Sequence, residues 1–203
     1  MRGWMLVVAL LGCAKPAPEE NASAPARADE AATVQVTEAN AQALARADEA
    51  ATTLGRTLKA RLQAELPKGV EQAMAVCAGE AQAMGAKVAA EQQAKVGRSS
   101  LRLRNPKNEA PSWVRDWLEV QGERKAEGAA GFARLDMTHA GPVARVLKPI
   151  AVEAPCVLCH GAPESLAVEV KAVLAEKYPQ DRATGYQVGD LRGALWAETP
   201  VAK

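Results

Sequence analysis

The chain has 203 residues, which is enough for one domain of ordinary size with an extension. Its 25 Lys and Arg residues nearly balance 24 Asp and Glu residues, so the net charge of +1 predicts neither nucleic acid nor an anionic membrane surface as a partner. Hydrophobic residues make up 48% of the chain and much of that is small alanine, so a bulky buried cofactor would help to fill a core, although a plain alanine-rich helical domain fits the same composition.

The N-terminal residues resemble a bacterial secretory signal. One arginine precedes an apolar run from Trp4 to Leu11, which is too short to span a bilayer, so we predict a signal peptide over residues 1–12. The run ends in "LLGC", which resembles a lipobox and predicts lipidation of Cys13. In Gram-negative lipoproteins a residue other than Asp at the next position, here Ala14, favours the outer membrane. We therefore expect a lipid-anchored protein on the periplasmic side of the envelope; a plain signal peptide with an incidental cysteine is the alternative.

A tether is predicted between this anchor and the folded domain. Residues 13–36 are mainly Ala, Pro, Glu, Asn and Ser with few large apolar side chains, so we expect a flexible linker. The domain itself is predicted over residues 37–203. Apolar residues recur at steps of three and four over residues 37–66, which indicates a long helix that ends near Pro67.

The rest of the chain mixes predicted helices and strands. A second helix over about 67–93 carries Cys77 on its apolar stripe, so this cysteine should face the interior. Alternation over 96–104 predicts a strand with arginines on one face. Further along we predict a loop over 105–112, a helix over 112–120, strands over 129–135 and 143–152, a helix over 163–179 and a last strand within 184–200. This order predicts an α+β fold, with an antiparallel sheet flanked by helices and long helices at its N-terminal side.

Residues 156–160 read "CVLCH". Cys156 and Cys159 have the spacing at which two thiols add to the two vinyl groups on one edge of a porphyrin, and His160 would then lie under the iron. In bacteria this attachment takes place outside the cytoplasm, so the export signal agrees with it independently. The sequence therefore predicts one covalently bound haem c.

Three other interpretations of the motif remain open. Zinc would need four N or S ligands, and Cys77 or His139 could complete a set with the motif. A thioredoxin-like redox pair would want its two cysteines at the opening of a helix after a strand. The third alternative is a structural disulfide between Cys156 and Cys159.

The haem interpretation leaves one face of the iron for another ligand. The residues that could supply it are Cys77, His139, Met74, Met84 and Met137. We favour Cys77, because it lies on an inward-facing stripe and a free cysteine in an exported protein is otherwise an oxidation hazard. A buried structural cysteine is the alternative role for this residue.

Four stretches of the sequence together resemble a family. They are "AMAVCAGEA", "VGRSSLRLRNPKNEAP", "VLKPIAVEAPCVLCHG" and "KYPQDRATGYQVGDLRGALW", and they extend over about residues 71–196. The resemblance is to the bacterial and cyanobacterial single-haem family with a PAS-like fold, whose members occur alone or as sensing parts of signalling proteins. One departure is Ser99, where members more often have Thr after the arginine.

The resemblance implies a site as well as a fold. It implies iron ligated by His160 on one side and by Cys77 on the other, an anionic sulfur that favours the ferric state and lowers the potential. It also covers Arg98 and Arg104, which we expect to pair with haem propionates, since arginine suits carboxylates; a solvated strand face is the alternative.

Two functions follow from this site. The first is a redox or diatomic-gas sensor, in which loss of Cys77 would open the iron to nitric oxide or carbon monoxide, with the signal passing to a separate protein. The second is a low-potential electron-transfer cytochrome with an unidentified redox partner. We do not expect an enzyme, because the sequence shows no acid–base constellation beside the motif. The membrane is expected as a partner only through the lipid anchor, and no nucleic acid is expected.

Overall fold

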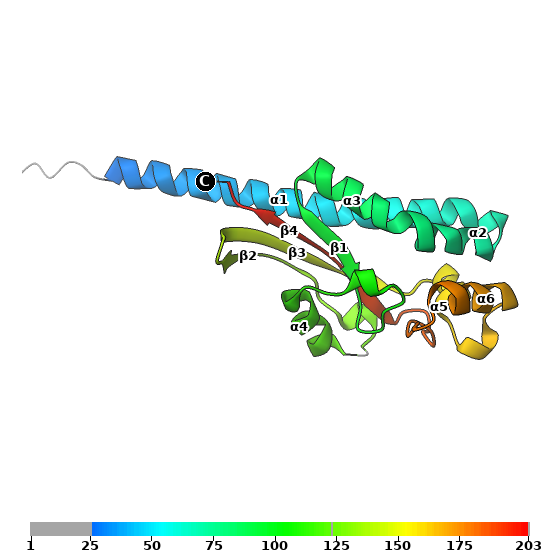
Figure 1. The fold of residues 1–203 in the computed structure, drawn as a ribbon. Helices are drawn as coiled ribbons and strands as arrows, with labels where there is room; N and C mark the ends of the chain where they lie inside the picture. Colours follow the sequence, from blue (N-terminus) through cyan, green and yellow to red (C-terminus); the bar gives the residue numbers. More distant parts are fainter. Residues whose placement is uncertain (1–25, 123, 203) are drawn as a thin grey trace, which may run out of the picture.

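A computed structural model describes residues 26–122 and 124–202 as a four-stranded antiparallel sheet with helices on both faces (Figure 1). The helices are α1 (Ala26–Glu65), α2 (Val70–Ala75), α3 (Ala81–Gln92), α4 (Ser112–Gln121), α5 (Val157–His160) and α6 (Val168–Lys177). The strands are β1 (Lys95–Ser99), β2 (Phe132–Thr138), β3 (Gly141–Ala151) and β4 (Leu191–Pro200). This architecture confirms the predicted α+β class with its long N-terminal helix; the PAS-like detail stays a prediction. Within the described residues, no helix has the length and apolar character needed to cross a membrane.

The sheet has the order β1-β4-β3-β2, and every neighbouring pair is antiparallel. The last strand of the chain therefore lies in the interior of the sheet, between the first strand and the hairpin of β2 and β3. Because side chains alternate along a strand, β4 sends Leu195 and Ala197 to one face and Ala194 and Trp196 to the other.

The first of these faces lies against α1. Helix α1 contributes a stripe of fully buried small residues to this contact. Among them are Ala43, Ala47 and Ala51, which pack on Val146 and Ala197 of the sheet. Alanines at these positions let the helix lie close to the strands. Ala47 and Ala51 belong to the apolar stripe predicted for the first helix, whereas Ala43 is an addition to it. In Figure 1, α3 lies alongside α1 on the same side of the sheet.

The second face is covered by α4. Trp113 of this helix contacts Trp196 edge to face, with ring centroids 6.0 Å apart, and Leu147 of β3 lies in the same cluster. A Cβ atom at Gly97 would lie 2.5 Å from the ring of Trp196, so β1 needs glycine where this ring crosses it. Helices therefore pack on both faces of the sheet, and the cavities lie at its ends.

Two predicted boundaries are wrong. Helix α1 begins at Ala26, so residues 26–36 are helical where we expected a linker; this stretch contains neither Gly nor Pro and is rich in Ala, a strong helix former. The strand predicted to run to Arg104 ends at Ser99, because the chain turns when the hydroxyl of Ser100 accepts a hydrogen bond from the backbone N–H of Arg102 (3.0 Å). The predicted signal peptide, Cys13 and the start of the linker lie outside the described residues.

Candidate functional site

A cavity of about 420 Å³ lies where the C-terminal half of α1, the helical segment that follows it and the segment after β3 meet. This volume is within the range of small-molecule and cofactor sites. Much of its wall is aliphatic, with Leu58 and Leu62 from α1, Ile150 from β3 and Leu195 from β4. The six predicted site residues within the described chain all line it: Cys77, Arg98, Arg104, Cys156, Cys159 and His160.

The Cys-x-x-Cys-His segment is held by tight backbone contacts. It follows β3 as a short 3-10 turn and then the four residues of α5, with the backbone N–H of Glu153 donating to Sγ of Cys156 (3.3 Å). A Cβ atom at Gly161 would lie 2.5 Å from the carbonyl oxygen of Val157, so the chain can turn here only with glycine. The backbone of Tyr186 donates to the carbonyl of His160 (2.9 Å), which ties the motif to a segment far along the chain.

His160 has the tautomer that a metal ligand needs. Its Nδ1 lies 2.6 Å from the carbonyl oxygen of Ala183, so Nδ1–H donates there and Nε2 keeps its lone pair. Burial, followed by the positive charges of Arg192 and Arg104, holds the pKa of His160 well below its ordinary value of 6.5. The imidazole is therefore neutral at neutral pH, as coordination requires.

Cys77 lies on a π-turn, Val76–Glu80, inserted between α2 and α3. The N–H of Ala81 reaches back five residues to the carbonyl of Val76, and such insertions occur frequently at functional sites. The hydroxyl of Tyr178, whose pKa is raised by burial, donates to the Cys77 carbonyl (3.2 Å). Cys77 is half-buried and faces the cavity, so it is not a plain core cysteine.

The other residues considered as iron ligands lie in less suitable places. Met74 lines the cavity but is 2% exposed and packs against α6. Met84 and His139 do not line the cavity, and His139 is exposed in the turn between β2 and β3. Met137 is 80% exposed on β2. Of these alternatives to Cys77 as an iron ligand, Met74 is the one that lines the cavity.

Arg104 is engaged by the protein itself. Its guanidinium forms a two-pronged ion pair with the carboxylate of Asp181, at 3.2 Å and 3.1 Å, and both side chains are only 9% exposed. The same guanidinium donates to the carbonyl of Cys159 (2.6 Å). Arg104 therefore holds the backbone of the motif in place, a role that the expected propionate contact did not include.

Two further arginines reach the cavity without a carboxylate. The side chain of Arg98 has neither a hydrogen bond nor an ion pair within the part of the chain that the structure describes. Arg192, which the sequence interpretation missed, lines the cavity from β4 and donates to the carbonyl of Arg102 (3.2 Å). It was the one charged residue at the start of a mainly apolar strand, inside the last of the four stretches that carry the resemblance.

The alternative interpretations of the motif find less support in this geometry. Among the described residues, no group of three or more His, Cys, Asp and Glu side chains gathers closely enough to hold a bare metal ion, which a zinc site would need. Cys156 and Cys159 are free thiols rather than a disulfide, and burial raises the pKa of Cys159, whereas a reactive redox thiol has a lowered one. The helix that follows Cys156 is only four residues long.

The chain is thus of the class of α+β domains in which one cavity is lined by a Cys-x-x-Cys-His segment, a separate cysteine and several arginines. The sequence matches the Tll0287-like family over residues 26–200, and the chain belongs to this family. Among solved structures, that of the cyanobacterial haem protein Tll0287 is 27% identical and covers 61% of this chain and 70% of its own, with a TM-score of 0.47. No curated protein matches the chain. The family agrees with the resemblance to haem proteins predicted from the sequence.

Proposed function

We propose that this protein binds one haem c covalently in the cavity described above. The observation that carries the proposal is that Cys156, Cys159 and the neutral imidazole of His160 line one cavity of suitable size. A member of the same family, Tll0287, is described as a haem protein. Cys156 and Cys159 would form the two thioether bonds, and Nε2 of His160 would be the first axial ligand.

The cavity wall fits a group with a flat apolar body and anionic substituents. Leu58, Leu62 and Ile150 offer aliphatic contacts, while Arg98 and Arg192 offer positive charge without a protein carboxylate beside them. The aliphatic contacts would stabilise a ring that is mainly hydrocarbon, and the arginines would stabilise carboxylates on its edge. The alanine-rich core of the protein would be completed by such a body.

Cys77 would supply the second axial ligand. Cys77 lines the cavity from a π-turn, a kind of insertion that is frequent at functional sites. Haem iron supplies one-electron redox chemistry, and where an axial position is free it binds diatomic gases. The thiolate of Cys77 would favour the oxidised form and lower the reduction potential.

We infer a sensory role from the way Cys77 is held. The Cys77 carbonyl is tied to α6 through Tyr178, so a change at the sulfur is connected to a helix that packs on α2. Loss of the thiolate ligand, on reduction or protonation, would leave a position for nitric oxide or carbon monoxide. A separate protein would receive the signal, and we expect no enzymatic activity.

Low-potential electron transfer is the second candidate, and Leu158 favours it. This residue lies between the two motif cysteines and is 46% exposed, so one apolar side chain is exposed beside the place where the haem edge would be attached. A redox partner could dock there. We further propose that the protein is exported and anchored through Cys13 to the periplasmic side of the envelope, and that it contacts the membrane only through this lipid anchor.

Acidified organic solvent tests the covalent haem directly. We would produce the full chain in cells that mature c-type cytochromes and extract it, beside the Cys156→Ala/Cys159→Ala variant. The pigment should stay with the protein in the parent chain and wash out of the variant. A parent chain without pigment, or one whose pigment is fully extracted, would overturn the proposal. Optical titration of the reduced protein with carbon monoxide then separates the two roles, since a pure electron carrier would keep both ligands and show no change.

A further inference from the structure

The charges around the cavity are unbalanced. Among the described residues that line it, four are cations and one is a carboxylate; the cations are Lys59, Arg98, Arg104 and Arg192. The carboxylate, Glu153, is paired with Lys59 at 2.6 Å, and both of these side chains are about half exposed. Arg104 has Asp181 as its partner. Two arginines are left without an anion.

Arg98 is the first of them. It shares a face of β1 with Val96, which packs toward α1, so its side chain extends into the cavity end of that face. No carboxylate, carbonyl or hydroxyl in the described residues accepts a hydrogen bond from its guanidinium. An arginine has five N–H donors, and leaving all of them without a protein partner inside a cavity is unfavourable.

Arg192 is the second, and it lies on the neighbouring strand β4. Its guanidinium carbon lies 5.3 Å from the ring centroid of Tyr186, and it donates to one backbone carbonyl. Burial is the main cause that lowers the pKa of Arg192 below its ordinary value; the charges of Arg104 and Arg98 add to this effect, and Tyr186 and Asp181 oppose it. An arginine stays protonated in proteins, so Arg192 brings to the cavity a positive charge that forms no ion pair with a described carboxylate.

We propose that Arg98 and Arg192 together bind the carboxylate groups of the molecule held in this cavity, and that Arg104 is a positioning residue that does not bind them. The inference deepens the proposed function, on which it rests, because a haem carries two propionates. It assigns a binding role to Arg192, and it gives Arg98 and Arg104 different roles, ligand binding for the first and positioning of the motif backbone for the second. Neighbouring arginines on adjacent strands would receive two carboxylates on one edge of a ring.

Comparison of a porphyrin with its ester tests this assignment. In the full-length Cys156→Ala/Cys159→Ala chain binding is reversible, so the affinity for iron protoporphyrin IX can be compared with that for its dimethyl ester, which lacks the carboxylates. The free acid should bind about tenfold more tightly. Arg98→Gln and Arg192→Gln should each reduce this preference, because each variant should weaken binding of the free acid more than binding of the ester. Arg104→Gln should weaken both porphyrins alike, and Arg115→Gln, an exposed control, should change neither.

A second measurement keeps the inference testable if the thiol-free chain binds neither porphyrin. In the covalent holoprotein, an acid titration of the haem absorption should show carboxylate ionisation at a higher pH in Arg98→Gln and Arg192→Gln than in the parent or in Arg115→Gln. Equal binding of acid and ester, or an unchanged titration, would overturn the assignment. A parent chain that acquires no covalent haem would instead overturn the proposed function, so the two failures are distinguishable.

Discussion

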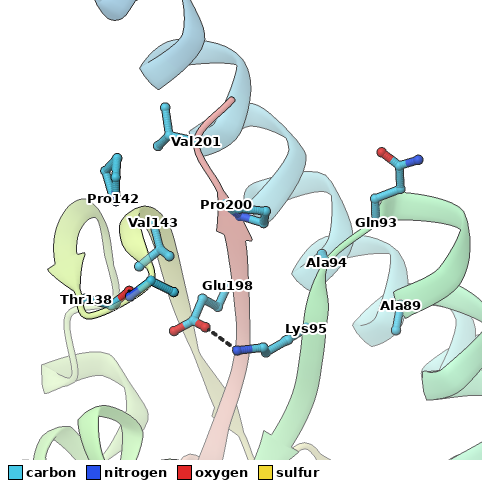
Figure 2. Close-up of a pocket in the computed structure, with 11 residues that line it drawn as sticks. Ala89, Gln93, Ala94, Lys95, Thr138, Pro142, Val143, Glu198, Pro200 and Val201 are labelled. Atoms are coloured by element: carbon cyan, nitrogen blue, oxygen red, sulfur yellow. Dashed lines mark hydrogen bonds and ion pairs between the residues drawn. The ribbon is translucent and has the colours of Figure 1, made fainter. Parts of the chain in front are cut away.

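The two ends of the sheet each hold a cavity, and the two cavities treat charge in opposite ways. The one beside the Cys-x-x-Cys-His segment measures about 420 Å³, and the one at the other end about 360 Å³. Figure 2 shows the second, where Lys95 points at Glu198 among apolar residues such as Pro200 and Val201. Glu198 there accepts from Lys95 (2.9 Å) and from Arg145 (2.9 Å). Its charge is satisfied by the protein.

At the cysteine end, by contrast, neither Arg98 nor Arg192 forms an ion pair with a carboxylate of the described residues, although both lie on strands of the sheet, as Glu198 does. An unpaired charge in a cavity is unfavourable unless a ligand pairs with it. The unpaired arginines at the cysteine end therefore indicate a site for an anionic ligand. Volume alone therefore does not identify the site. The cysteine end is distinguished by its unpaired cations, its half-buried cysteines and the neutral imidazole of His160.

The largest effect is expected from His160, the proposed axial ligand at the cysteine end of the sheet. His160→Ala removes Nε2, so the ferric absorption spectrum should change and the yield of stable holoprotein should fall roughly tenfold or more. His139→Ala is the matched control, because this second histidine is exposed in a turn. Absorption spectra and haem stain of the purified proteins measure both. An unaltered spectrum in His160→Ala would remove this residue from the iron.

Cys77→Ser should have the next largest effect. Replacing a thiolate by a weakly bound hydroxyl takes an anion from the iron, so the reduction midpoint should rise by a sizeable part of the roughly 0.8 V over which axial ligands set haem potentials. The ferric spectrum should change with it. Ala78→Ser, on the same π-turn, adds a hydroxyl without removing sulfur and should leave the midpoint near that of the parent. A midpoint equal in the two variants would contradict ligation by Cys77.

The sequence shows the local parts of this site and not the ones made by folding. Cys156, Cys159 and His160 are close together in the chain, and their spacing alone predicts covalent haem attachment. Cys77 could be predicted to face inward from helical periodicity. The π-turn that carries it could not, because an insertion of this kind depends on tertiary contacts such as the one from Tyr178.

Partnership between distant residues is the other part that the sequence conceals. Arg104 and Asp181 are 77 residues apart, and nothing in either neighbourhood indicates that one side chain would neutralise the other. Without that pair, the alternation of Arg98 and Arg104 suggested equal roles on one strand. Because β1 ends at Ser99, the two arginines instead lie on different segments, and of the two only Arg104 is paired with a described carboxylate.

The Arg104–Asp181 pair should contribute more to the free energy of unfolding than the exposed Arg115–Glu109 pair. Both side chains are 9% exposed, so Arg104→Gln leaves a buried carboxylate without its cation and should lower the free energy of unfolding by about 3 kcal/mol. Arg115→Gln, which breaks an exposed pair with Glu109, should cost less than about 1 kcal/mol. Urea denaturation of the holoproteins measures both. Equal midpoints would show that the buried pair is dispensable.

The smallest effect is expected at the opposite end of the sheet, from Glu198→Gln. Burial raises the pKa of Glu198, but hydrogen bonds and charge from Lys95 and Arg145 outweigh it, so the pKa lies below its ordinary value of 4.5. The carboxylate therefore contributes stability that is fully present above about pH 4.5 and is lost as the pH falls through the lowered value.

Glu198→Gln should remove this contribution, about 1 kcal/mol at neutral pH, and should flatten the loss of stability below pH 4.5 while leaving the haem spectrum unchanged. Urea denaturation at several pH values, followed by absorption, measures both parts. A variant whose stability keeps the acid dependence of the parent would show that Glu198 is not the group responsible. A changed haem spectrum would show that the two ends of the sheet are coupled, because a paired charge at one end would then influence the unpaired charges at the other.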